Sequence, residues 1–129
     1  MELKYTIGIA PITKKNSQRI VRYGARVSIA PSKQYENYAA SAWAYLRPKP
    51  PLPIDFPVEV QCKFYMPNKR RVDLTNLLEA VDDVLVKYGI LEDDSSNILV
   101  SHDGSRVLHD KDRPRTEIVI REVQDAAEN

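Results

Sequence analysis

The residues best suited to chemistry lie between Asn68 and Asp103, where basic and acidic side chains occur in short clusters. Three basic residues, 69–71, come just before the carboxylate of Asp73, and a second acidic group occupies 92–94. Mg²⁺ prefers oxygen ligands, and two or three carboxylates suffice when a phosphate and waters supply the rest. Neighbouring Arg and Lys side chains would hold the flanking phosphates. The pattern therefore predicts metal-dependent cleavage of a phosphodiester.

Each acid also has a purely structural interpretation. Asp73 stands where the N-cap of a helix is expected, and the acidic group 92–94 is typical of a solvated turn. Asp82 and Asp83 fall inside the same predicted helix. We expect Asp82 to face solvent, and we choose neither of the two as a metal ligand.

The remaining reactive side chains are too sparse to form a familiar site. His102 and His109 lack the His/Cys spacing of a zinc site, and no glycine pattern of a nucleophile elbow supports Ser-His-Asp catalysis. Tyr35, Tyr38 and Trp43 could stack on bases, but their helical spacing favours a place in the core.

The chain has 129 residues, enough for one domain with a single core. Its net charge of +1 hides an asymmetry, because residues 1–71 carry +9 and residues 72–129 carry −8. Basic groups gathered in one half could face a polyanion, and carboxylates gathered in the other could hold a cation. Alternatively, folding interleaves the two halves and the asymmetry has no consequence.

Cysteine content and hydropathy predict the cellular setting. Cys62 is the only cysteine, which excludes an internal disulfide and a Cys-rich zinc site and predicts a reducing, cytoplasmic location. The first ten residues contain Glu2 and Lys4 and no long apolar stretch, so they do not resemble a secretory signal. No apolar run approaches the roughly 18–20 residues of a bilayer span, so we expect no membrane contact.

Hydrophobic periodicity predicts a single α+β domain over residues 1–129, with a mostly antiparallel, mixed sheet of four or five strands and two helices. The expected strands are 3–10, 27–29, 58–66, 97–101 and 116–121, and the expected helices are 33–46 and 74–88. Three other segments are a basic loop or hairpin (12–26), a stiff proline-rich connector (47–57) and a frayed tail (122–129).

Four segments in this order carry a resemblance to a known family. They are Pro11 to Asn16, Val27 to Tyr38, the block Met66 to Leu77 (MPNKRRVDLTNL) and the turn Gly89 to Asp94 (GILEDD). The chain resembles the RusA family of phage and prophage Holliday junction resolvases over nearly its whole length. The resemblance implies an intertwined homodimer that cuts four-way DNA junctions with Mg²⁺, or with Mn²⁺, which also takes oxygen ligands.

By this resemblance, Asp73 and Asp94 correspond to catalytic, metal-binding aspartates of the family. The chain departs from the family pattern at Thr75, where a second aspartate is usual, and at Glu79, where the best-known member has a lysine. One interpretation is that another acid replaces the missing ligand; the candidates are Asp93, Asp103 and Glu79. The other is that the protein binds branched DNA and cuts it poorly. We favour the first interpretation.

The helix between Asp73 and Asp94 imposes a geometric condition. About 14 helical residues extend roughly 21 Å, so the two carboxylates meet in one chain only if the acidic turn doubles back. In a two-fold dimer with antiparallel helices, Asp73 of one chain would approach Asp94 of its partner. The strand that ends at Asp103 could also run back toward Asp73.

A basic face completes the expected site. We expect it to contact the phosphates of branched DNA through Lys14, Lys15, Asn16, Lys69, Arg70 and Arg71. Two alternatives to a nuclease remain open at this point: a non-catalytic DNA-binding protein that uses the same face, and a small interaction protein whose charge asymmetry is incidental.

Overall fold

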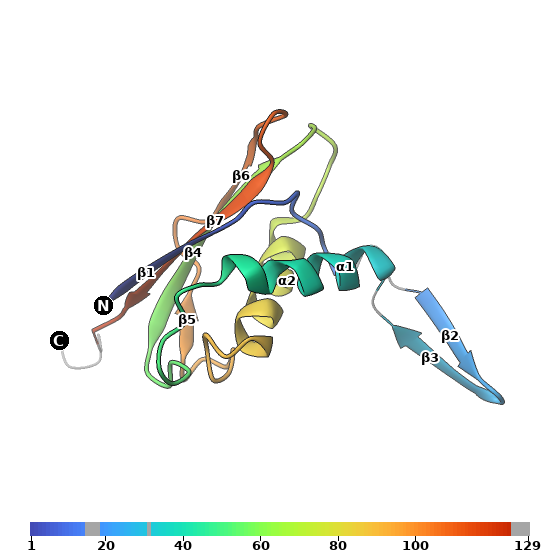
Figure 1. Ribbon diagram of the computed structural model, residues 1–129, viewed down its shortest axis with the longest axis horizontal. Helices are drawn as coiled ribbons and strands as arrows, with labels where there is room; N and C mark the ends of the chain where they lie inside the picture. The colour runs from blue at the N-terminus through green and yellow to red at the C-terminus, as the bar shows by residue number, and fades with distance from the viewer. Residues whose placement is uncertain (15–18, 31, 125–129) are drawn as a thin grey trace.

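The computed structural model describes residues 1–14, 19–30 and 32–124. It contains a five-stranded sheet, two helices on one side of that sheet, and a two-stranded hairpin that projects away (Figure 1). In chain order the elements are β1 (Glu2–Ile7), β2 (Arg19–Tyr23), β3 (Arg26–Ala30), α1 (Lys33–Ala42), the 3₁₀ helix η2 (Trp43–Tyr45), β4 (Val58–Met66), α2 (Leu74–Lys87), β5 (Leu99–Ser101), β6 (Arg106–His109) and β7 (Arg115–Glu122). The predicted α+β fold is confirmed. Within the described residues, no helix is both long and apolar enough to cross a bilayer.

Strands β4 and β7 form the centre of the main sheet and pair antiparallel. β1 pairs antiparallel with the other edge of β7, whereas β5 and β6 pair in parallel with the start and the end of β4. The alternation in β4 has the predicted effect, because Val58, Val60, Cys62 and Phe64 are all buried on the side that the helices cover.

Helix α2 packs an apolar stripe into the same core. Leu77, Val81 and Leu85 recur every four residues and are at most 1% exposed. Asp73 occupies the N-cap position. Beyond the other end, Gly89 has a φ of 76°, a left-handed conformation that favours glycine and stops the helix.

Helix α1 begins as predicted and ends earlier. The Ser32 side chain accepts a hydrogen bond from the backbone N–H of Tyr35 (3.0 Å), which caps the helix. The α-helix stops at Ala42, and the last predicted turn is the tighter 3₁₀ helix η2. The proline-rich connector is neither a helix nor a central strand, as predicted. Its Ile54 forms only an isolated parallel bridge to Leu91.

Two segments near the C-terminus correct the prediction. Strand β6 lies in the polar segment that was expected to be irregular. It was not predicted because its residues 106, 107 and 109 are exposed and show no apolar alternation. The predicted frayed tail also begins too early. Glu122 still belongs to β7, and the N–H of Val123 donates to the carbonyl of Pro57 (3.0 Å). Residues 125–129 lie outside the described part of the chain.

The predicted basic loop or hairpin (12–26) and the predicted strand 27–29 overlap one hairpin, in which β2 and β3 pair antiparallel from Arg19–Ala30 to Tyr23–Arg26. Among the described strands, neither pairs with the main sheet. At the far end of the hairpin, Tyr23 and Val27 are 68% and 65% exposed. An isolated two-stranded hairpin is marginally stable in water, so this extension lacks the support that a third strand or a packed partner would provide.

Candidate active site

Asp73 lies at the start of α2 with a carboxylate that does not cap the helix. Its backbone is extended, as an N-cap requires, but its side chain accepts no hydrogen bond from the N–H groups of the first turn. Instead, the side-chain amide of Asn76 donates to Asp73 Oδ2 at 3.3 Å. Asp73 is exposed. The N-cap interpretation explains where this residue stands, but it leaves the carboxylate available to a ligand.

The three basic residues before Asp73 occupy the connection between β4 and α2. The side chains of Lys69, Arg70 and Arg71 are exposed, and the backbone N–H of Arg70 donates to Asn68 Oδ1 at 2.9 Å. The free N–H groups and the dipole at the start of α2 add to this positive field. Cations and a helix N-terminus together attract phosphate to the neighbourhood of Asp73.

The second acidic group lies in the turn after α2. The backbone N–H of Glu92 donates to the carbonyl of Ile54 (2.9 Å), which holds the turn beside the segment that leads into β4. A hydrogen bond from the side chain of Ser95, followed by one from the backbone of Asp94, lowers the pKa of Asp93. Asp93 therefore takes part in the turn itself, whereas Asp94 is an exposed carboxylate.

Within the described part of one chain, the predicted ligands do not form a group of three. Helix α2 has 14 residues and a length of roughly 21 Å, with Asp73 just before its start and the acidic turn after its end. Asp103 is exposed in the turn after β5, and Glu79 is half-buried on α2. In the described part of the chain, no three His, Cys, Asp or Glu side chains lie close enough to hold one metal ion. Both solutions derived from the sequence, an acidic turn that doubles back and a two-fold dimer, therefore still apply.

Lys14, expected on the basic face, lies between the two helices. Its Nζ is 2.6 Å from Asp83 Oδ2 and 5.8 Å from the ring centroid of Tyr35. Asp83 already offsets its charge, which weakens the case for a phosphate contact. Burial, and then the charge of Asp83, raises the pKa of Tyr35 to about 12. Lys15 and Asn16 lie outside the described residues.

Asp82 is buried, which corrects the expectation that it faces solvent. It is 8% exposed, and its Oδ2 lies 2.8 Å from His102 Nε2. The other ring nitrogen of His102, Nδ1, lies 2.9 Å from the carbonyl oxygen of Val60. The spacing of the residues could have predicted this burial, because Leu78, Asp82 and Leu85 follow the i, i+4, i+7 pattern of a buried helix face.

The contacts of His102 fix where its protons lie. A carbonyl oxygen only accepts, so Nδ1 carries a proton donated to Val60, and Nε2 shares a second proton with Asp82. Burial lowers the pKa of His102, but the hydrogen bond and charge of Asp82 outweigh it and raise the pKa overall. Burial is also the main cause that raises the pKa of Asp82, and the charge of Asp94 adds to it. The pair therefore retains a proton that the unfolded chain would release.

We expect His102→Gln to lower the free energy of unfolding by about 1–3 kcal/mol, because Asp82 loses its partner while buried. The raised pKa of His102 means that its contribution is complete below the ordinary value of 6.5 and is lost as the pH rises through the folded-state value. Urea unfolding at about pH 5.5 and about pH 8.5 measures this, and the wild-type advantage should be larger at the lower pH. His109→Gln, at an exposed position, is the matched control. A larger advantage at the higher pH contradicts the shared proton.

Comparison with known proteins bears on the whole of this region. Residues 9–121 match the family model described as Endodeoxyribonuclease RusA. The matched range includes both helices and every predicted site residue from Lys14 to Asp103. No curated protein matches the chain. Because the family match extends over most of the 129 residues, the chain belongs to the RusA endodeoxyribonuclease family.

Proposed function

We propose that this protein is a metal-dependent endonuclease that resolves four-way DNA junctions by paired, symmetric cuts. Membership of an endodeoxyribonuclease family supports DNA cleavage. The observation that carries the rest is the exposed carboxylate of Asp73, which does not cap its helix and lies beside the exposed cations Arg70 and Arg71. A ligand for a divalent ion thereby stands next to groups that bind phosphate.

The proposed cofactor is Mg²⁺, with Mn²⁺ as the alternative, because both ions take oxygen ligands. The donor chemistry fits, since Asp73 and Asp94 are exposed carboxylates and Asn76 orients the first of them. When bound, the ion would supply an activated water and offset negative charge on the leaving oxygen. Further candidate ligands are Asp93, Asp103 and Glu79.

The residues of the chain itself bind and orient the substrate. Arg70 and Arg71 can each take a phosphate oxygen pair through two parallel N–H donors, which fixes the backbone of the strand. Lys69 adds a third cation on the same exposed connection. When these cations hold the phosphates beside Asp73, the DNA strand stays in a fixed position relative to the metal ligand.

Two chains would complete two equal sites. Because α2, roughly 21 Å long, stands between Asp73 and the acidic turn, we place the shared ion between two copies whose helices run antiparallel. Each Asp73 would then approach Asp94 of the partner subunit. A four-way junction has approximate two-fold symmetry, so a dimer with two such sites can make two symmetric cuts.

The hairpin supports a dimer independently of the acids. β2 and β3 project from the body of the molecule and, among the described strands, pair only with each other (Figure 1). Tyr23 and Val27 leave apolar surface uncovered there. A hairpin gains stability when it packs on another surface, and a second copy of the chain offers the symmetric solution.

A second candidate function is binding of branched DNA without efficient cleavage. It is favoured by Thr75, exposed in the first turn of α2 where the family pattern has an aspartate. A hydroxyl is a weaker ligand for Mg²⁺ than a carboxylate. Binding that persists in chelator, with no cleavage when Mg²⁺ is added, would select this second function.

Asp73→Asn and Asp94→Asn should each reduce Mg²⁺-dependent cleavage of a synthetic four-way junction by about 100-fold or more, while junction binding in chelator persists. Mixing the two variants tests the shared site. A mixed dimer has one site with both carboxylates and one with neither, so nicking should return without paired cuts. Asp112→Asn, at an exposed position in the β6–β7 loop, should match the wild type. Mixed dimers that never nick rule out sharing.

Replacing the apolar tip of the hairpin should separate the subunits. The double variant Tyr23→Glu/Val27→Glu puts charge on surface that we place in the dimer interface, and sedimentation velocity should then show a monomer. Leu52→Glu changes an apolar residue that is 78% exposed elsewhere and should leave the dimer intact. If the tip variant sediments as a dimer, or the wild type as a monomer, the hairpin does not hold the subunits together.

Arg70→Gln/Arg71→Gln should flatten the salt dependence of junction binding. Each lost phosphate contact lowers the slope of log K against log salt by about 0.9, so the double variant should lose about two units. Fluorescence anisotropy with a labelled junction at several salt concentrations measures the slope. Arg106→Gln, exposed on β6, is the control. An unchanged slope in the double variant excludes these arginines from the DNA contact.

A further inference from the structure

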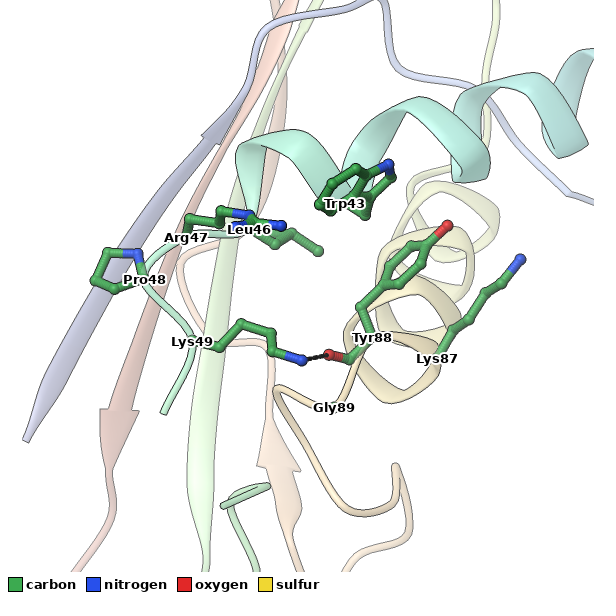
Figure 2. A pocket seen from close by; sticks show the side chains of 8 residues that line it. All are labelled: Trp43, Leu46, Arg47, Pro48, Lys49, Lys87, Tyr88 and Gly89. Carbon is green, nitrogen blue, oxygen red and sulfur yellow. Dashed lines mark hydrogen bonds between the residues drawn. The ribbon is translucent and has the colours of Figure 1, made fainter. Parts of the chain in front are cut away.

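A cavity of about 870 Å³ opens between the end of α1 and the end of α2 (Figure 2). Trp43 and residues 46–49 line one side and residues 87–89 the other. This volume lies in the range of roughly 300–1,000 Å³ that is typical of sites for small ligands. None of the residues predicted as metal ligands or DNA contacts lines it, so it is distinct from the site described above.

Two aromatic rings from different segments border the cavity. Trp43 is 48% exposed, whereas its spacing had favoured the core; the buried stripe of α1 passes through Tyr38 and Ala42 instead. The ring of Tyr88 is fixed at its far end, where the hydroxyl donates to the carbonyl of Ala39 (2.7 Å). An exposed indole and an anchored phenol offer flat surfaces on which a planar base can stack.

Three cations surround the same space, and among the described residues no carboxylate lines it. The guanidinium of Arg47 lies 4.5 Å from the ring centroid of Trp43. Lys49 donates from Nζ to the carbonyl of Tyr88 (3.2 Å), which leaves two of its three N–H groups for another acceptor (Figure 2). None of the ion pairs found between described residues involves Arg47, Lys49 or Lys87.

Part of this charge has a structural explanation. Lys87 lies in the last turn of α2, where the helix dipole favours a cation, and Lys49 satisfies one carbonyl at the same end. Neither role involves Arg47, which follows α1 and covers an exposed ring. Cations beyond those that the helix end requires, gathered around a cavity without acids, favour a bound anion.

We propose that this pocket binds an unpaired nucleotide of a DNA strand, with the base stacked on Trp43 and the phosphate held by Arg47 and Lys49. The proposal rests on the proposed nuclease function and extends it. Gly89 borders the pocket, and the chain reaches Asp94 from there within at most about 18 Å. The nucleotide would therefore lie near the acidic turn that contributes to the cleavage site.

Substrate preference follows from this arrangement. A base inside a duplex has both faces covered by its neighbours, and exposing it costs a few kcal/mol unless it is already unpaired. A junction that carries a short unpaired stretch at the branch should therefore bind more tightly than a fully paired junction.

The chain contains a single tryptophan, so the fluorescence of Trp43 reports directly on the pocket. In chelator, which prevents cleavage, we expect the junction with the unpaired stretch to quench this fluorescence saturably, and the fully paired junction to quench it less.

Trp43→Leu should weaken binding of the unpaired junction between about 5-fold and about 150-fold, as loss of one stacked base does. Tyr45→Leu, also an exposed aromatic of η2 but outside the pocket, should bind like the wild type. Arg47→Gln leaves the indole in place and should also bind more weakly, which keeps the test informative if Trp43→Leu does not fold.

Three results would overturn the proposal in distinguishable ways. Equal binding of the unpaired junction by wild type and Trp43→Leu, without a change in fluorescence, excludes the pocket as a nucleotide site and leaves the proposed nuclease function in place. Equal quenching by free dTMP at the same concentration assigns the pocket to a free nucleotide rather than to a strand. Failure of every DNA to bind removes the pocket and the proposed function together.

Discussion

The rigid length of α2 is the constraint on which the rest of the structure depends. Its apolar stripe is buried against the sheet, and its two ends are fixed by the connection from β4 and by the hydrogen bond between Glu92 and Ile54. A packed helix of 14 residues does not bend to bring its ends together. The two ends of the helix therefore stay apart, and we place a site that uses both Asp73 and Asp94 between two chains.

Each end of this helix presents features that suit a nucleic-acid strand. Exposed arginines precede its N-terminus, and the cationic, aromatic pocket lies at its C-terminus. If two helices lie antiparallel, the arginines of one subunit come next to the pocket and the acidic turn of the other. A strand could then be held by phosphate contacts on one side of the cut and by base stacking on the other. Asp82 and His102 support this arrangement from within, because their hydrogen bond ties the middle of α2 to the segment after β5.

Sequence periodicity predicted most of the fold because its strong signals are local. The alternation in β4 and the stripe of α2 depend on apolar residues at fixed spacing, and both elements were predicted within one residue of their ends. β6 was missed because an exposed edge strand need not alternate. The burial of Asp82 was not predicted because a polar side chain can be buried only with a partner, and that partner, His102, is distant in sequence. The pocket depends on where two helix ends meet, and residue types alone do not reveal such a meeting.

The central claim is that one divalent ion is shared by Asp73 of one subunit and Asp94 of the partner subunit. A crystal structure of the protein with Mn²⁺, in which anomalous scattering locates the ion, tests it most directly. The account predicts an ion with carboxylate oxygens from both subunits at roughly 2–2.6 Å. An ion held by the acids of one chain only, with the other subunit's carboxylate far away, would contradict it.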